Sequence, residues 1–304
     1  MLNFLLRHID VVDVLEWAKT LPTPPEELHR IKAERADAIE KLSAAIALLL
    51  DPAPGVALSG VRALVALADS SSGIRRQRAV SALCDYLKIE QPDPAVSAVI
   101  LQHFTRHLQV KQGDVSDLVP LDDSLPASSL WNDCAFDLEG ALFLTDIDFS
   151  RCVFRARLDL EDATFTAGTN FSYAFFQGGV DFEDAAFGEA ARFASSRFGG
   201  PADFEGAQFG KTADFKDCRF FSAADFANSR FGRAVRFTDA QFSGMTDFED
   251  ADFQGSADFS GTQFGDPLLG KVFRLDNPDF DGARFEGPVS FEGSNAGSGA
   301  ASAR

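Results

Sequence analysis

The stretch at residues 202–232 reads "ADFEGAQFGKTADFKDCRFFSAADFANSRFG" and decides the fold of the second half of the chain. It places a phenylalanine at positions 204, 209, 215, 220, 226 and 231, so the intervals alternate between five and six residues. An α-helix repeats about every 3.6 residues and a strand about every 2, so neither regular element produces this rhythm. The spacing instead predicts short extended segments separated by corners.

The rhythm continues in both directions and forms two series of rings, each with a period of eleven residues. One series runs from Phe149 to Phe259, with Leu160 at its second position, and the other runs from Phe154 to Phe264. A mostly small residue stands two positions before each ring, and a polar residue, commonly Asp, stands between them. Because side chains alternate along a strand, the small residue and the ring face one side, while the polar residue faces the other.

Four such segments close a square coil of 22 residues, which is two periods of eleven. Stacked coils would pair their backbones at about 4.8 Å, the strand spacing in a sheet. We therefore expect Phe204 to stack on Phe182 and Phe226 at about 4.5 to 7 Å.

The extra residue of each six-residue unit follows the second ring, where glycine collects. The glycines after these rings are Gly188, Gly199, Gly200, Gly210, Gly232, Gly244 and Gly255. They predict a wider corner whose backbone has positive φ.

The segments "ADFEGAQFG", "ADFKDCRFF", "ADFANSRFG" and "ADFSGTQFG" resemble the pentapeptide-repeat family, whose unit is A(D/N)Lxx with Leu or Phe at its centre. The resemblance covers about 138–293, from Leu138 and Phe143 to a late group of Phe280, Phe285 and Phe291. It implies a right-handed quadrilateral parallel β-helix with a filled interior. This chain departs from the family pattern because Phe almost replaces Leu and every second unit has six residues.

The first 130 residues read as amphipathic helices of the length found in HEAT or armadillo repeats. The expected helices are 2–21, 24–50, 56–71, 73–88 and 93–111. They resemble, more weakly, the helical module that precedes pentapeptide repeats in many bacterial proteins, especially actinobacterial ones.

The sequence therefore predicts an α+β chain in two parts. The expected parts are a helical domain at 1–130, a β-helix at 131–293 with an irregular insertion at about 265–279, and a disordered tail at 294–304. We expect the helical domain to cap the first coil, with Trp131 in the junction, because an uncovered end exposes unpaired backbone.

Charge and cysteine usage favour a cytoplasmic protein. The chain has 304 residues and a net charge of −18; residues 1–130 hold 13 basic and 17 acidic residues, and the remainder holds 15 and 29. The four cysteines form no CxxC pair, so neither a zinc site nor a disulfide framework is expected. The start of the chain does not read as a secretion signal, and the longest apolar run, "AAIALLL", is far shorter than a membrane span.

The sequence does not predict an enzyme, a metal site or a cofactor. It contains no Ser/His/Asp grouping, no phosphate-binding glycine loop with Lys, and no histidine after His107. His103 and His107 lie four apart and could form one edge of a metal site, but without a third ligand we interpret them as surface residues. The cluster Arg75, Arg76 and Arg78 is interpreted as a solvated helix start and not as a nucleic-acid patch.

Outward residues that lie 22 apart in sequence would form columns along the axis of the coil, and one face of these columns is strongly acidic. Twelve carboxylates collect on one face, within five segments that contain no Lys or Arg. They are Asp159, Glu161, Asp162, Asp181, Glu183, Asp184, Asp203, Glu205, Asp225, Asp247, Glu249 and Asp250. The opposite column is interrupted by Asn170, Arg192 and Arg236.

Three interpretations of this acidic column remain open. Asp before a ring is common in the family, and acidity also keeps a β-rich rod soluble. The interpretation that we favour is a protein-interaction scaffold whose partner has a basic surface, without direct nucleic-acid binding. The alternative follows from the resemblance, since some acidic members of the family mimic duplex DNA and occupy the DNA-binding groove of a type II topoisomerase such as gyrase.

Overall fold

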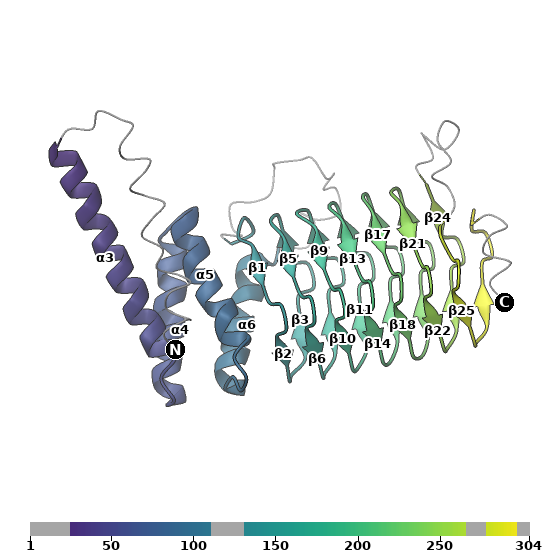
Figure 1. Cartoon of the computed structure of the whole chain (residues 1–304), viewed down its shortest axis with the longest axis horizontal. Coiled ribbons are helices and arrows are strands. Elements are labelled where there is room, and N and C mark those ends of the chain that lie inside the picture. Colours follow the sequence, from purple (N-terminus) through teal and green to yellow (C-terminus); the bar gives the residue numbers. More distant parts are fainter. Residues whose placement is uncertain (1–24, 111–130, 266–277, 297–304) are drawn as a thin grey trace. The chain divides into compact units, whose positions relative to one another are not determined.

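A computed structural model describes residues 25–110, 131–265 and 278–296 of the chain (Figure 1). The chain divides into two compact units, Met1–Ile100 and Leu101–Arg304, and each is described by itself. The helix expected at 2–21, most of the insertion at about 265–279, and residues 297–304 of the expected tail lie outside the described residues.

Four of the expected helices are present in the described part of the chain. They are α3 (Pro25–Leu49), α4 (Pro54–Asp69), α5 (Ile74–Leu87) and α6 (Pro94–Leu108). Helix α4 begins with a proline in its first turn, where the missing N–H costs nothing. It packs closely on the end of α3, because a Cβ atom on Gly60 would lie only 2.6 Å from Cα of Leu49.

The rest of the described chain forms a parallel β-helix with four sheets, drawn from teal to yellow in Figure 1. The first sheet contains β1 (Phe136–Asp137), β5 (Leu158–Asp159), β9 (Val180–Asp181), β13 (Ala202–Asp203), β17 (Ala224–Asp225) and β21 (Thr246–Asp247). The second contains β2 (Leu142–Phe143), β6 (Thr164–Phe165), β10 (Ala186–Phe187), β14 (Gln208–Phe209), β18 (Arg230–Phe231), β22 (Asp252–Phe253) and β25 (Arg284–Phe285).

The other two sheets complete each coil. The third contains β3 (Ile147–Asp148), β7 (Thr169–Asn170), β11 (Ala191–Arg192), β15 (Ala213–Asp214), β19 (Val235–Arg236), β23 (Ala257–Asp258) and β26 (Val289–Ser290). The fourth contains β4 (Val153–Phe154), β8 (Phe175–Phe176), β12 (Arg197–Phe198), β16 (Arg219–Phe220), β20 (Gln241–Phe242) and β24 (Gln263–Phe264). The predicted quadrilateral β-helix is confirmed.

The 22-residue coil and the inward direction of both ring series are confirmed. Phe204 stacks on Phe182 with ring centroids 4.9 Å apart and on Phe226 at 4.8 Å. Phe193 and Phe215 belong to the same series but lie on the opposite wall, and they meet Phe204 edge-on at 5.6 and 5.4 Å. Each ring therefore combines offset stacking along the axis with edge contacts across it, the two geometries that aromatic pairs prefer.

The five-residue corner is a tight turn that contains a left-handed residue. In one such corner, the N–H of Ala207 donates to the carbonyl of Phe204 at 3.1 Å, and Gly206 has φ of 67°. The carboxylate of Asp203 accepts the N–H of Glu205 at 3.0 Å. This combination is typical of a type II turn reinforced by an Asx turn, and it explains why a polar residue precedes the ring.

The glycines of the six-residue corner were expected to have positive φ, and this prediction is wrong. None of the seven named glycines has positive φ, and the left-handed positions recur instead at the five-residue corners. Close approach between successive coils selects glycine at several of these corners. A Cβ atom on Gly200 would lie 2.5 Å from the backbone nitrogen of Gly179, and one on Gly232 would lie 3.2 Å from the carbonyl oxygen of Gly210.

Several small inward positions carry a hydroxyl or thiol that bonds to the neighbouring coil. The Ser196 hydroxyl donates to the carbonyl of Phe171 at 2.6 Å, and the Thr262 hydroxyl donates to that of Phe237 at 2.8 Å. Ser229 is equally buried, but its hydroxyl has no hydrogen-bond partner among the residues that the structure describes.

The first coil is covered within the second unit by the last turns of α6. The Phe104 ring packs edge-on against Phe136 at 5.0 Å, and the His107 ring stacks on Trp131 at 4.1 Å. The N–H of Val110 donates to the carbonyl of Arg151 at 3.1 Å, which pairs the segment after α6 with the coil. Trp131 therefore lies in the cap as predicted.

His107 and Val110 also belong to this cap. His107 is buried and its Nδ1 lies 2.7 Å from the carbonyl of His103, so its interpretation as a surface residue was wrong. Val110 also covers Val153 and Phe175, which explains why these outward positions of the fourth sheet are apolar.

The coil resumes after the insertion. Phe280 stacks on Phe248 at 4.9 Å, and β25 pairs with β22 with Arg284 opposite Asp252. The Asn295 side chain then bonds both the N–H and the carbonyl of Phe264, at 2.7 and 2.8 Å.

Truncation of a central ring should be far more costly than truncation of an outward one. Phe215 is fully buried, and its replacement by Ala removes contacts with neighbours in its own wall and in the opposite wall, so we expect a loss of about 3 to 5 kcal/mol. Phe221 follows a ring position and is 37% exposed, so Phe221→Ala should cost much less. Urea titrations of the two variants measure this, and equal losses would contradict the assignment of inward and outward positions.

The two buried serines give a matched pair. Ser196→Ala removes a satisfied hydrogen bond and should lower the free energy of unfolding by about 1 kcal/mol. Burial of the Ser229 hydroxyl without a partner costs free energy, so Ser229→Ala should leave the free energy of unfolding unchanged or raise it. Thermal unfolding of both variants tests this, and destabilisation of the same size at Ser229 would show that its hydroxyl is bonded in solution.

Candidate binding surface on the first sheet

The strand register of the first sheet places its aspartates in one straight row. Asp159, Asp181, Asp203, Asp225 and Asp247 are each paired with the next along the sheet, and we name these five residues the Asp row. The twelve predicted carboxylates thus lie in this sheet and in the turns that follow its strands.

Sequence reasoning missed the two ends of this row. Asp137 pairs with Asp159, and Asp279 forms a bridge with Asp247. Asp137 could have been found by stepping 22 residues back from Asp159. Asp279 could not be found by counting, because the insertion separates it from Asp247 by 32 residues.

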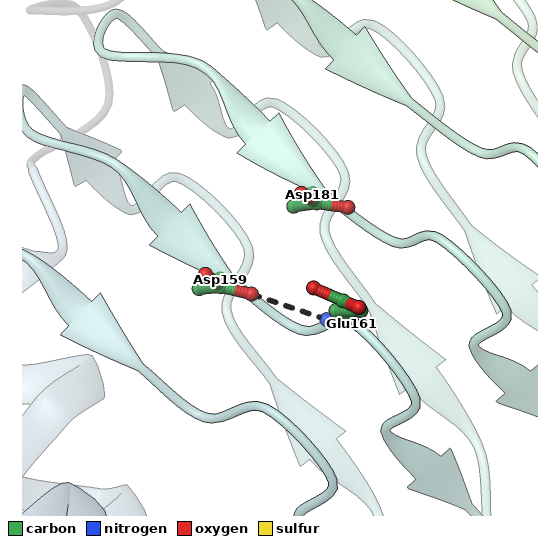
Figure 2. A group of neighbouring side chains, drawn as sticks. All are labelled: Asp159, Glu161 and Asp181. Atoms are coloured by element: carbon green, nitrogen blue, oxygen red, sulfur yellow. Dashed lines mark hydrogen bonds between the residues drawn. The ribbon is translucent and has the colours of Figure 1, made fainter.

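A second line of carboxylates lies in the turns. Glu161, Glu183, Glu205 and Glu249 each stand two residues after a member of the Asp row, and we name them the Glu row. Asp162, Asp184 and Asp250 follow them in the left-handed turn position. Figure 2 shows Asp159, Glu161 and Asp181, with the Asp159 carboxylate accepting the N–H of Glu161 at 3.3 Å.

The Asp row has a structural role that the Glu row does not share. Asp181 and Asp247 accept the turn N–H groups of Glu183 and Glu249, at 3.0 and 2.8 Å. The Glu residues contribute these backbone N–H groups, while their carboxylates lie at least partly exposed. Changes to the Glu side chains therefore leave the turn hydrogen bonds in place.

The third sheet shows that this fold does not require an unbroken row of carboxylates. The equivalent outward positions there are Asp148, Asn170, Arg192, Asp214, Arg236, Asp258 and Ser290. Arg236 forms an ion pair with Asp214 at 2.8 Å, so opposite charges compensate one another along that sheet. The same position on the first sheet accumulates negative charge instead.

One cation does enter the acidic face. Arg157 Nη2 lies 2.6 Å from Asp181 Oδ2 and 3.3 Å from Asp159 Oδ2. Sequence reasoning missed it because the segments that were compared began at the aspartates. Side-chain alternation could have revealed it, since Arg157 stands two residues before Asp159 and shares its face.

Crowding and partial desolvation disfavour the charged forms of five of these carboxyl groups. The pKa of Glu183 is raised by desolvation and then by the negative charges of Asp203 and Glu161. The pKa of Glu249 is raised first by the charge of Asp247. The pKa values of Glu161, Asp203 and Asp247 are also raised, with desolvation as the largest cause.

Some of the carboxylates approach closely enough to share a cation. Oxygens of Asp159, Glu161 and Asp181 lie within 4.8 Å of one another, and so do those of Asp181, Glu183 and Asp203. Each residue offers one oxygen, whereas Ca²⁺ takes six to eight. Arg157 already engages two of these carboxylates. The groups repeat with the coil and form no closed cage, so we treat them as crowded surface carboxylates.

The basic cluster in the helical unit has a local structural role. Arg76 donates to the carbonyls of Ala68 and Ser71, at 3.3 and 2.7 Å, and so satisfies groups at the end of α4. Arg76, in the helix start that was expected to be solvated, therefore also stabilises the end of the preceding helix α4. Within the described residues, no helix has the length and apolar character that a membrane span needs.

The raised pKa values predict a stability that falls as the pH rises. A carboxyl group with a raised pKa in the folded state binds protons more tightly there, so its favourable contribution is complete below the unfolded pKa of about 4 and is lost as the pH rises through the folded value. The triple variant Glu161→Gln, Glu183→Gln and Glu249→Gln should therefore show less loss of stability than the wild type between mildly acidic and neutral pH.

Urea midpoints measured across that pH range test this expectation. The control changes Glu40, Glu90 and Glu189, which are exposed and lie off the face, to Gln. It should keep the wild-type pH dependence. An unchanged pH dependence in the first triple variant would contradict the proposed crowding.

The comparisons with known proteins agree with the fold. The family model described as pentapeptide repeats (9 copies) matches residues 172–219, 182–230 and 226–268. No curated protein and no solved structure matches the chain. Residues 172–268 therefore match pentapeptide repeats, with a ring every five or six residues in a four-sided coil, and these repeats follow an N-terminal helical segment.

Proposed function

We propose that this protein is a non-catalytic scaffold that binds a protein partner with a basic surface through the Asp row and the Glu row. The observation that carries the proposal is the contrast between equivalent positions in two sheets. The third sheet alternates Asp214, Arg236 and Asp258, whereas the first sheet repeats Asp in every coil. Since the fold accepts Arg at this position, the unbroken row calls for a separate explanation.

The row is costly for the isolated protein, and a basic partner would remove that cost. Like charges about 5 Å apart repel by roughly 1 kcal/mol in water and more near a protein surface. Lys and Arg side chains placed along the rows would favour the ionised forms of carboxylates such as Glu161 and Glu183, whose pKa values are raised in the free protein. A one-sided field would also speed the encounter with a basic surface. We also propose a cytoplasmic setting, which the four free thiols support.

A second candidate function uses the same face as a mimic of duplex DNA. Twelve carboxylates lie on five successive coils, and with a rise of about 4.8 Å per coil this gives one negative charge per about 2 Å. Duplex DNA carries one per about 1.7 Å of its axis. This similar charge density supports binding in the DNA groove of a protein such as a type II topoisomerase.

Charge reversal of the Glu row should abolish binding of a basic ligand while the fold is retained. In the variant Glu161→Lys, Glu183→Lys, Glu205→Lys and Glu249→Lys, the affinity for fluorescein-labelled oligolysine should fall at least about tenfold, or about 1.4 kcal/mol. Wild-type binding should also weaken as salt rises from low to physiological concentration, because exposed charges are screened. Fluorescence anisotropy measures both effects.

The matched control carries the same change in net charge at sites off the face. It combines Glu40→Lys, Glu90→Lys, Glu189→Lys and Glu286→Lys, all at exposed residues. Its affinity should stay close to that of the wild type. Equal losses in both variants would assign binding to overall charge and would contradict the proposal. Inhibition of gyrase supercoiling by the wild type, lost in the Glu-row variant alone, would favour the DNA-mimic candidate.

A further inference from the structure

A second row of residues precedes the Asp row by two positions in each coil. It reads Arg157, Gly179, Pro201, Ala223 and Met245. Each of them lies in the corner before a strand of the first sheet; Arg157, Pro201, Ala223 and Met245 are exposed there, whereas Gly179 is buried. After Arg157 and Gly179 the row becomes apolar.

The apolar part of this row is exposed. Met245 is 67% exposed, and Phe221, which begins the same corner as Ala223, is 37% exposed. We name Pro201, Phe221, Ala223 and Met245 the apolar rim. On the third sheet the positions that correspond to Ala223 and Met245 are Ala234 and Ser256, so the fold does not require a large apolar side chain at this corner.

The rim and the uncompensated carboxylates occupy the same coils. Arg157 pairs with Asp159 and Asp181 at the start of the face. No such ion pair is formed by Asp203, Asp225 or Asp247 in the part of the chain that the structure describes. These aspartates stand two residues after Pro201, Ala223 and Met245. The surface therefore offers negative charge and apolar area side by side over three coils.

We propose that the partner docks here as a basic amphipathic helix that lies along the axis of the β-helix. Its Lys and Arg side chains would meet the Asp row and the Glu row, and its apolar side chains would cover the rim. This inference rests on the proposed function and specifies the partner's chemistry. Charge complementarity and the burial of Met245 and Phe221 both favour such a ligand.

The repeat of the surface fits a helix better than a strand. One turn of an α-helix rises about 5.4 Å, close to the coil spacing of about 4.8 Å, whereas side chains on one face of a strand recur at about 6.6 to 7 Å. Four coils span three spacings, so over that length the side chains of the ligand fall out of step with the coils by about 2 Å for a helix and about 6 Å for a strand. A strand also could not extend the first sheet at β13 or β17, because both are already paired on each side.

Three peptides of identical Lys and Leu composition test the proposal with the full-length protein. One peptide places Leu at helical spacing, one alternates Lys and Leu, and one is scrambled. We expect the helical pattern to bind at least about tenfold more tightly than the other two, and to gain helical circular dichroism on binding. The double variant Phe221→Ser and Met245→Ser should bind it no more tightly than the scrambled peptide.

The control variant changes exposed apolar residues that lie outside the rim. Leu142→Ser with Leu144→Ser changes two exposed apolar residues at the first coil of the second sheet and should leave affinity unchanged. Equal binding of all three peptides would overturn this inference while leaving the acidic face as a binding site. An equal loss in the Leu control would overturn the role of the rim. If the protein binds neither oligolysine nor any of the three peptides, both proposals are overturned.

Discussion

The stacking of identical rings at the spacing of paired strands is the constraint on which the rest of this structure depends. Parallel pairing fixes the rise per coil at about 4.8 Å, a distance at which aromatic rings stack with a small offset. Phe204 and its neighbours Phe182 and Phe226 satisfy both conditions at once. Because every coil repeats this solution in register, every outward position also repeats at the same spacing.

Because of this repetition, a residue preference at one turn position produces a continuous row on the surface. An Asp before one ring merely satisfies a turn N–H, but an Asp in every coil of the first sheet builds a continuous negative row. The third sheet uses the same turn and tolerates Arg192 and Arg236, so the difference between the two faces lies in the sequence and not in the backbone. The interaction that we propose follows from this asymmetry, since the rings fill the interior of the coils and the outward residues carry the difference.

Much of the fold could be predicted from the sequence because ring spacing, small residues and strand alternation all point to one geometry. The corners were harder to predict, because glycine occurs both where the backbone has positive φ and where two backbones approach closely. Only the structure shows that Gly200 belongs to the second case. The acidic face could be assembled by counting, but Asp279 lies beyond an insertion, and the pairing of Arg157 depends on its reach across to Asp181. His107 looked like a surface residue because its partner, Trp131, is distant in sequence.

The central claim is that the acidic face of the β-helix binds a basic partner. Hydrogen exchange with mass spectrometry, recorded with and without saturating oligolysine, tests it most directly because it locates the contact along the chain. The account predicts slower exchange at the turn amides of Glu205 and Glu249 and unchanged exchange at the equivalent third-sheet amides of Lys216 and Ser260. Protection spread equally over both sheets, or confined to the helical unit, would contradict it.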